Sequence, residues 1–127
     1  MDTVAVSSMK IEVRNENDVT VIVPVGSLVI GQPEEAINST VTRTLADGRS
    51  LLVIDLGEVK KIDSSGIETL LTACQRARDA GGDVRLARVA PRFQTLLEIA
   101  HLTNVLKIYP DVETAVKDFV LYTPRPS

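Results

Sequence analysis

Short apolar runs alternate along this chain with longer segments in which apolar residues recur every three or four positions. Residues 10–14 alternate polar and apolar side chains, residues 19–25 are β-branched, and the polar segment 15–18 lies between them, which predicts a hairpin. Pro24 lacks the N–H that a sheet hydrogen bond needs, so we expect the second strand to end there or to meet an edge. Residues 51–56 are apolar at nearly every position, which is typical of a strand covered on both faces.

Helical spacing appears four times, and each segment has residues that favour a helix start or end. Proline or a capping residue stands at every expected start, and glycine at two of the expected ends. The starts are Pro33, Ser64, Pro91 and, as a cap, Asp111, and the two glycine-containing ends are Asp47-Gly48 and Gly81-Gly82. The residues expected to face inward are Ile37, Val41 and Leu45; Ile67, Leu70, Leu71, Cys74 and Ala77; Phe93, Leu96, Leu97 and Ala100; and Val112, Ala115, Val116 and Phe119.

Two further strands complete the expected order. They lie at 84–89 and, as a short edge strand, at 106–109, and the order of elements becomes β-β-α-β-α-β-α-β-α. Because strands that alternate with helices pair in parallel, this order predicts an α/β fold, a mixed, mostly parallel β-sheet with an N-terminal antiparallel hairpin and about four helices. We place this domain at 9–120, between a flexible N-terminus at 1–8 and a frayed tail at 121–127.

Composition narrows the class of protein. The 127 residues carry a net charge of −3 and include no Trp, two Tyr and two Phe, so the chain has neither the basic patch nor the stacking residues typical of nucleic-acid binding. Cys74 is the single cysteine and falls on an apolar helix face, so we interpret it as a core residue and expect no metal site or cofactor. The start does not have the pattern of a secretory signal, and no apolar stretch has the length of a membrane span. We therefore expect a cytoplasmic monomer without direct membrane binding.

The run Asp63-Ser64-Ser65-Gly66 is the strongest candidate site. Each of the first three residues can cap a helix, for about 1 kcal/mol relative to alanine, although one cap would suffice. Gly66 costs roughly 1 kcal/mol within a helix, and we interpret its missing side chain as space for an approaching partner. The run follows the expected central strand, where open α/β sheets present functional groups. A helix N-terminus also tolerates a phosphate, which makes the serines candidates for modification.

Catalytic interpretations are weaker. His101 is the only histidine, and we expect it to make a polar contact at the end of the third helix; no G-x-S-x-G motif surrounds Ser64. A triad could still assemble from distant parts of the chain, so a small hydrolase using Ser64 stays open as an alternative. A phospho-acceptor aspartate would need an acidic pair after the first strand, which this chain lacks. We therefore expect Asp55 to end its strand in a polar contact and Asp63 to cap its helix.

Several of these segments together resemble the STAS domain of the anti-sigma factor antagonists, over roughly residues 9–120. They are the strand at 51–56, the run Ile62-Asp63-Ser64-Ser65-Gly66-Ile67, Gly81-Gly82, the turn Gly26-Ser27-Leu28, Pro91-x-Phe93 and the stretch from Leu97 to Ile108. The resemblance implies the STAS fold and a regulator that is not an enzyme. In this family the serine directly after the aspartate is the phosphorylation site, which is Ser64 here, with Ser65 as a secondary site.

The resemblance also implies a partner switch. The unphosphorylated protein would bind an anti-sigma factor, a serine kinase of the histidine-kinase-like ATPase class, and thereby release the sigma factor; a PPM-type phosphatase would reset it. The implied partner-binding residues lie in the loop expected at 26–31 and at the start of the following helix. They are Ser27, Leu28, Val29, Ile30, Asp63, Ser65, Gly66, Ile67 and Thr69.

One position departs from the family pattern. The family usually has an acidic residue just after the Gly-x-Leu turn, whereas this chain has Val29, and its loop continues to Gly31. Two alternatives therefore stay open: a structural STAS scaffold of a stress-sensing assembly, and a STAS subunit of a lipid-transport ATPase complex.

Overall fold

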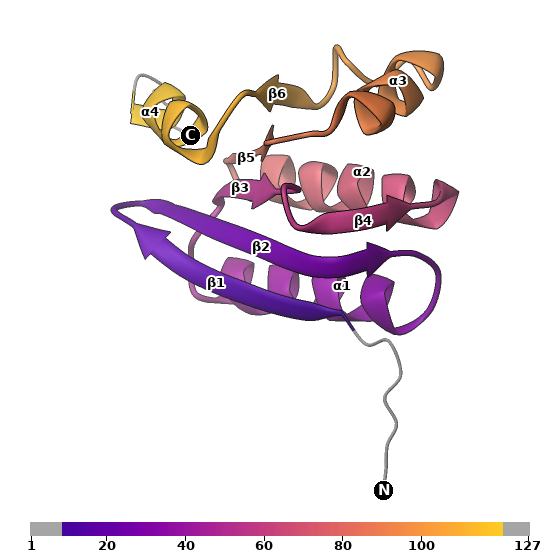
Figure 1. Ribbon diagram of the computed structural model, residues 1–127. Helices are drawn as coiled ribbons and strands as arrows, with labels where there is room; N and C mark the ends of the chain where they lie inside the picture. Colours follow the sequence, from indigo (N-terminus) through magenta and orange to yellow (C-terminus); the bar gives the residue numbers. More distant parts are fainter. Residues whose placement is uncertain (1–8, 121–127) are drawn as a thin grey trace, which may run out of the picture.

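The computed structural model of this protein describes residues 9–120. A six-stranded sheet forms its centre, and the helices pack against it (Figure 1). The strands follow the order β1-β2-β3-β5-β6, and β4 pairs with β2 off this path. The strands are β1 (Lys10–Glu16), β2 (Val19–Leu28), β3 (Leu51–Asp55), β4 (Val59–Ile62), β5 (Asp83–Ala87) and β6 (Lys107–Tyr109). The helices are α1 (Gln32–Ala46), α2 (Ser64–Asp79), α3 (Pro91–Ile99) and α4 (Val112–Val120). The expectations for 1–8 and 121–127 lie outside the described residues.

The expected α/β architecture is confirmed. β1 pairs antiparallel with β2, from Glu16 opposite Val19 to Lys10 opposite Val25, and Asn17 turns the hairpin with a φ of 59°. The other paired strands of the described residues run parallel. β1 forms an outer edge of the sheet, and most of its side chains are exposed. The sheet is thus mixed and mostly parallel, with an N-terminal antiparallel hairpin.

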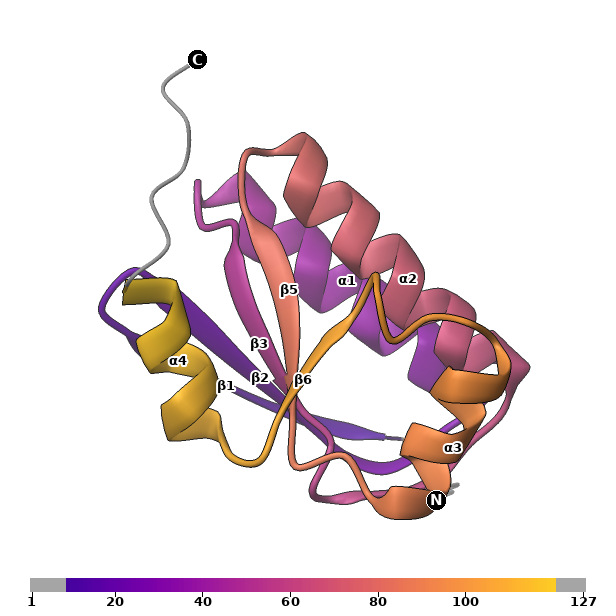
Figure 2. The same ribbon diagram turned by 90° about the horizontal axis from the view of Figure 1, so that it is seen from above.

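Alternating side chains divide the interior into two layers. Figure 2 shows α1 and α2 side by side on one face of the sheet and α4 on the other. On β3, Leu52 and Ile54 belong to the core under α1 and α2, whereas Val53 belongs to the core under α4. Cys74 is 1% exposed within the first of these cores, which raises the pKa of its thiol and confirms it as a core residue.

The end of β2 differs from the sequence expectation. β2 continues past Pro24 to Leu28, so of the two alternatives for Pro24 only the strand end is wrong. The expected loop at 26–31 shrinks to 29–31. β2 pairs with β3 up to Ile22 and with β4 from Gly26. Pro24 lies in the gap between these two partners, where its missing N–H costs no hydrogen bond on that side.

β4 is absent from the expected order of elements. It has only 4 residues, and the two central ones, Lys60 and Lys61, are exposed, so it lacks the apolar run that predicts a strand. Its pairing with the last part of β2 extends the sheet toward the start of α2. The described residues therefore contain one strand more than the sequence predicts.

The helices bury the faces expected of them, with one exception. The expected inward residues of α1, α2 and α4 are buried or half-buried. In α3, Phe93 and Leu97 are buried, but Leu96 is 39% exposed and Ala100, just after the helix, is also exposed, so those two expectations are wrong. α3 has only 9 residues and meets the core along one line of residues spaced four apart, which leaves its other apolar side chains near the surface.

Candidate functional site at the start of α2

Ser64 is the first residue of α2 and is exposed, whereas Ser65 beside it is half-buried. The helix begins one residue after β4, so the serines lie at the carboxyl end of β4 and beside the last residues of β2. The sequence analysis expected the serines directly after the central strand, β3. That expectation is wrong, because β4 lies between β3 and α2. The general expectation holds, because the carboxyl ends of parallel strands still meet at this edge of the sheet.

Asp63 caps α2 and also reaches the loop between β2 and α1. Its Oδ1 accepts a hydrogen bond from the Gly66 backbone N–H at 3.0 Å, and its Oδ2 accepts one from the Ile30 backbone N–H at 3.1 Å. The bond from Gly66 contributes most to lowering the pKa of the Asp63 carboxyl, and bonds from Ile30 and Ser65 act in the same direction. The expectation that Asp63 caps the helix is confirmed.

Gly66 allows α2 to approach the sheet closely. A Cβ at this position would lie 2.4 Å from the Leu28 carbonyl oxygen, 2.9 Å from Leu28 Cγ and 3.0 Å from Ile62 Cγ2. These distances are too short for any side chain, so glycine is required by packing within the protein. The interpretation of Gly66 as space for an approaching partner is wrong.

Three residues expected on the partner surface are inside the protein. Leu28 is 0% exposed, and Gly66 is buried against it. Thr69 is 2% exposed, and its hydroxyl donates to the Ser65 carbonyl at 2.9 Å. These residues are buried where α2 packs against the end of β2. They therefore offer no side-chain surface to a partner.

The other expected partner residues do come together at the surface. Ile30 is 71% exposed, and the remaining ones are half-buried. The Asp63 backbone N–H donates to the Leu28 carbonyl at 3.3 Å, which fixes the start of α2 beside the end of β2. The residues that form this surface, from the end of β2 to the first turn of α2, are Ser27, Val29, Ile30, Asp63, Ser64, Ser65 and Ile67. Binding of a partner to them stays a prediction.

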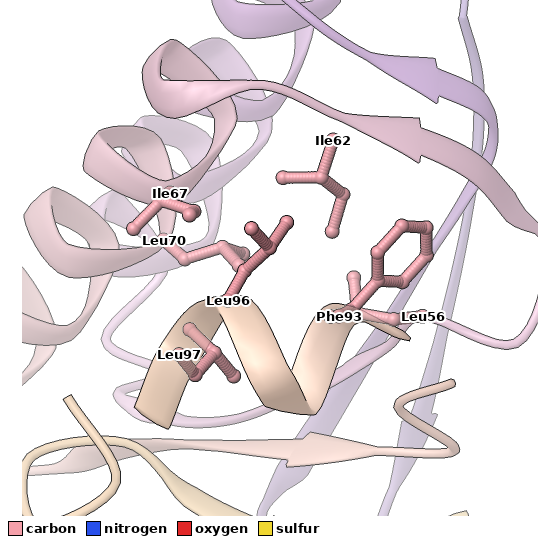
Figure 3. Close-up of a pocket in the computed structure, with 7 residues that line it drawn as sticks. All are labelled: Leu56, Ile62, Ile67, Leu70, Phe93, Leu96 and Leu97. Carbon is pink, nitrogen blue, oxygen red and sulfur yellow. The ribbon is translucent and has the colours of Figure 1, made fainter. Parts of the chain in front are cut away.

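Sequence reasoning missed an apolar hollow beside this surface. Figure 3 shows Leu96 of α3 directed toward Ile62 of β4, and Ile67, Leu70 and Leu97 also line the hollow. Its free volume is only about 10 Å³, close to the minimum for one water molecule, so it is no small-molecule site. The sequence signal was present in the helical spacing of these residues, but it also fits ordinary core packing.

Two residues considered for catalysis, Asp55 and His101, lie at the ends of structural elements. Asp55 is 4% exposed and accepts from Arg88 Nε at 2.8 Å and from the Gly57 N–H at 3.0 Å, which confirms a polar contact at the end of β3. His101 is exposed with a φ of 60°, and its backbone N–H donates to the Glu98 carbonyl at the end of α3. Within residues 9–120, no group of three or more His, Cys, Asp or Glu side chains is placed to hold a metal ion. No helix in that part of the chain could span a membrane.

Known structures share this architecture. An anti-sigma-factor antagonist (STAS) domain protein from Planctomyces limnophilus is 26% identical, with a TM-score of 0.73 over 87% of this chain and 97% of that one. A putative anti-sigma factor antagonist from Thermotoga maritima is 20% identical, with a TM-score of 0.74 over 85% and 92%. Bacillus SpoIIAA in its phosphorylated form is 17% identical, with a TM-score of 0.67 over 88% and 99%.

A family model confirms the resemblance that the motifs indicate. The model described as the STAS domain matches residues 10–115, which includes every strand of the sheet, α1 to α3 and the whole site around Ser64. The match extends over far more than half of the 127 residues. This chain belongs to the STAS domain family.

Proposed function

We propose that this protein is an anti-sigma factor antagonist, a cytoplasmic switch without enzymatic activity of its own, whose partner binding is controlled by phosphorylation of Ser64. The observation that carries the proposal is the position of Ser64, exposed on the first residue of α2. Asp63 already caps the helix, so the Ser64 hydroxyl is not needed for that role. A side chain that is exposed and structurally dispensable is a suitable acceptor for a phosphoryl group.

The helix start suits the phosphorylated state as well as the free one. Phosphorylation would add roughly −1.5 to −2 charge at Ser64, and the positive end of the α2 dipole favours negative charge there. The fold should therefore survive the modification, while any partner packed over Ser64 would meet new charge and bulk. That asymmetry is what a binary switch requires.

The proposed partners come from the family resemblance, and the similar structures support the phosphorylation step. SpoIIAA is known in an unphosphorylated and a phosphorylated form, and both share this fold. We assign the kinase role to an anti-sigma factor of the histidine-kinase-like ATPase class, which binds the unphosphorylated protein and releases its sigma factor. A PPM-type phosphatase reverses the modification. Ser65, half-buried one residue later, is the secondary acceptor.

A pull-down from native lysate with four baits tests the proposal: the wild-type protein, Ser64→Ala, Ser64→Asp and, as a matched control, Ser39→Asp. Ser39 is an exposed serine on α1, so its substitution adds the same charge to a helix away from the site. We expect a small ATPase-fold kinase with every bait except Ser64→Asp, and phosphate on Ser64 of the protein isolated from cells.

One observation favours a second candidate, because Val29 stands where the family usually has an acidic residue. A STAS scaffold of a stress-sensing assembly, or a STAS subunit of a lipid-transport ATPase complex, would need no switch at Ser64. If all four baits recover the same scaffold or membrane assembly, that candidate replaces the proposed switch.

A further inference from the structure

Two aspartates in this protein cap helices, and they use their carboxylates differently. Asp111 caps α4, and its Oδ1 accepts from the Thr114 N–H at 2.7 Å, within the first turn of its own helix. Asp63 caps α2 with Oδ1, yet its Oδ2 accepts from Ile30, which is 33 residues away in the sequence. A cap needs only one oxygen, so the second bond of Asp63 does something other than start the helix.

That second bond fixes a very short loop. Residues 29–31 connect β2 to α1, and Leu28 before them is held by the bond from the Asp63 N–H to its carbonyl. Gly31, the last residue of the loop, caps α1 with a positive φ of 106°, and its carbonyl accepts from the Glu35 N–H. The backbone is thus held at Leu28, just before the loop, and within the loop at Ile30 and Gly31.

The fixed loop presents an apolar side chain. Ile30 is 71% exposed, the largest exposed fraction among the large hydrophobic residues described, although nothing in the loop requires an isoleucine. It stands beside the exposed Ser64 because both are joined to Asp63, one by a hydrogen bond and one by the peptide bond. An apolar side chain on a rigid backbone loses little entropy on binding, which suits it to act as an anchor in a partner's pocket.

We infer that Asp63 is a positioning residue for the partner surface: its carboxylate holds the loop at 29–31 so that the kinase partner contacts Ile30 and Ser64 as one unit. The inference rests on the proposed function, because that function supplies the partner. It adds that the kinase carries an apolar pocket for Ile30 next to the group that meets the Ser64 hydroxyl.

The first test needs no partner and uses the full chain. In wild-type protein, the amide ¹H shifts of Ile30 and Gly66 should titrate together with one midpoint below the ordinary aspartate pKa of about 3.9. Asp63→Asn keeps a good cap but places an amide N–H₂ where Oδ2 accepted the Ile30 bond, so this acid step should vanish at Ile30. Asp111→Asn, the same change at a cap without a distant bond, should leave it unaltered. An Ile30 amide that does not titrate, or still titrates in Asp63→Asn, overturns the inference.

The second test uses the kinase captured by the wild-type bait. Asp63→Asn and Ile30→Ala should each weaken its binding at least about tenfold. Asp111→Asn and Ile99→Ala should not; Ile99, on α3, is the matched control because it is 70% exposed.

The outcomes separate the two proposals. If Ile30→Ala binds like wild type while Ser64→Asp does not bind, the switch stands and the inference fails. If no bait captures a kinase, the proposed function fails, and the partner role of Ile30 fails with it.

Discussion

On the face of the sheet under α1 and α2, the interior is made of leucine, isoleucine and other apolar side chains, whereas the face under α4 contains a buried arginine. Arg85 is 2% exposed, forms an ion pair with Asp118 and lies 4.1 Å from the Phe119 ring centroid. Tyr109 donates to the same Asp118 carboxylate at 2.6 Å. The face under α4 thus adds a buried ion pair and an arginine–ring contact to its apolar core. The site around Ser64 belongs to the first face, so its geometry depends on how closely α2 approaches the sheet.

Gly66→Val should have the largest effect, because it breaks that close approach. Its Cβ would lie 2.4 Å from the Leu28 carbonyl oxygen, a backbone atom that cannot rotate away. We expect a loss of roughly 3 kcal/mol or more in the free energy of unfolding, measured by urea denaturation. Thr72→Val on the exposed surface of α2 is the control and should change stability by less than about 0.5 kcal/mol. A folded Gly66→Val protein of wild-type stability would contradict the packing argument.

Arg85→Met tests the face under α4 and should reduce the free energy of unfolding less than Gly66→Val does. The methionine fills part of the same volume but leaves Asp118 without its arginine partner, whereas Asp83 keeps its 2.9 Å ion pair with Arg78. Because the Asp118 side chain is 38% exposed and water can solvate it, we expect a loss of roughly 2 kcal/mol rather than the full cost of a buried unpaired charge. Urea denaturation measures it, with the exposed Arg43→Met as control. Equal stability of Arg85→Met and wild type would mean that the apolar contacts alone hold α4.

Acid should weaken one helix cap on each face of the sheet. The pKa values of Asp63 and Asp111 are lowered in the folded state, chiefly by backbone hydrogen bonds from Gly66 and Thr114. Their contributions to stability are therefore present above the unfolded aspartate pKa of about 3.9 and are lost as the pH falls through the lower folded values. Thermal melting from pH 6 to pH 2 should show a shallower acid loss in Asp63→Asn and in Asp111→Asn than in wild type. An unchanged acid slope in both variants would contradict these shifts.

Ser64→Ala should have the smallest effect. Although a serine there could cap the helix, Asp63 already does so, and the expected change in the free energy of unfolding is within about 0.5 kcal/mol. Ser64→Asp should likewise keep the fold, because its charge lies at the positive end of the α2 dipole. Thermal melting of both variants checks this, and a loss above about 1 kcal/mol in Ser64→Ala would show that the hydroxyl has a structural role.

The sequence predicted the elements whose local signals agree with their packing. Residues 51–56 are apolar except for Asp55 because β3 is covered on both faces, and Gly81-Gly82 ends α2 because the Gly82 N–H donates to the Ala77 carbonyl at 2.8 Å. β4 could not be predicted, since its stability comes from pairing with a distant strand and not from its own four residues. For the same reason Pro24 did not end β2: only the tertiary structure shows that β2 changes partner there.

At the site, the sequence predicted which residues come together but not what each of them does. Asp63 was identifiable as a cap from its position before an apolar helical stripe. Its second bond to Ile30 joins residues far apart in the sequence, and no local pattern contains it. Gly66 was misinterpreted because a glycine needed for internal packing and a glycine that leaves room for a partner look the same in a sequence. Only the 2.4 Å distance to Leu28 separates them.

The exposed outer strand β1 limits how any partner can bind. Its outward charges alternate in sign, with Lys10 4.0 Å from Glu12 and Arg14 2.8 Å from Glu16. Charged side chains along an edge oppose the addition of another strand, whether from a second copy or from a foreign chain. Binding of a partner strand along β1 is therefore disfavoured, and a partner at this edge would have to contact side chains instead. In the proposed switch, a single phosphorylated hydroxyl could then decide binding, because no ladder of backbone hydrogen bonds along β1 would hold the partner after the modification.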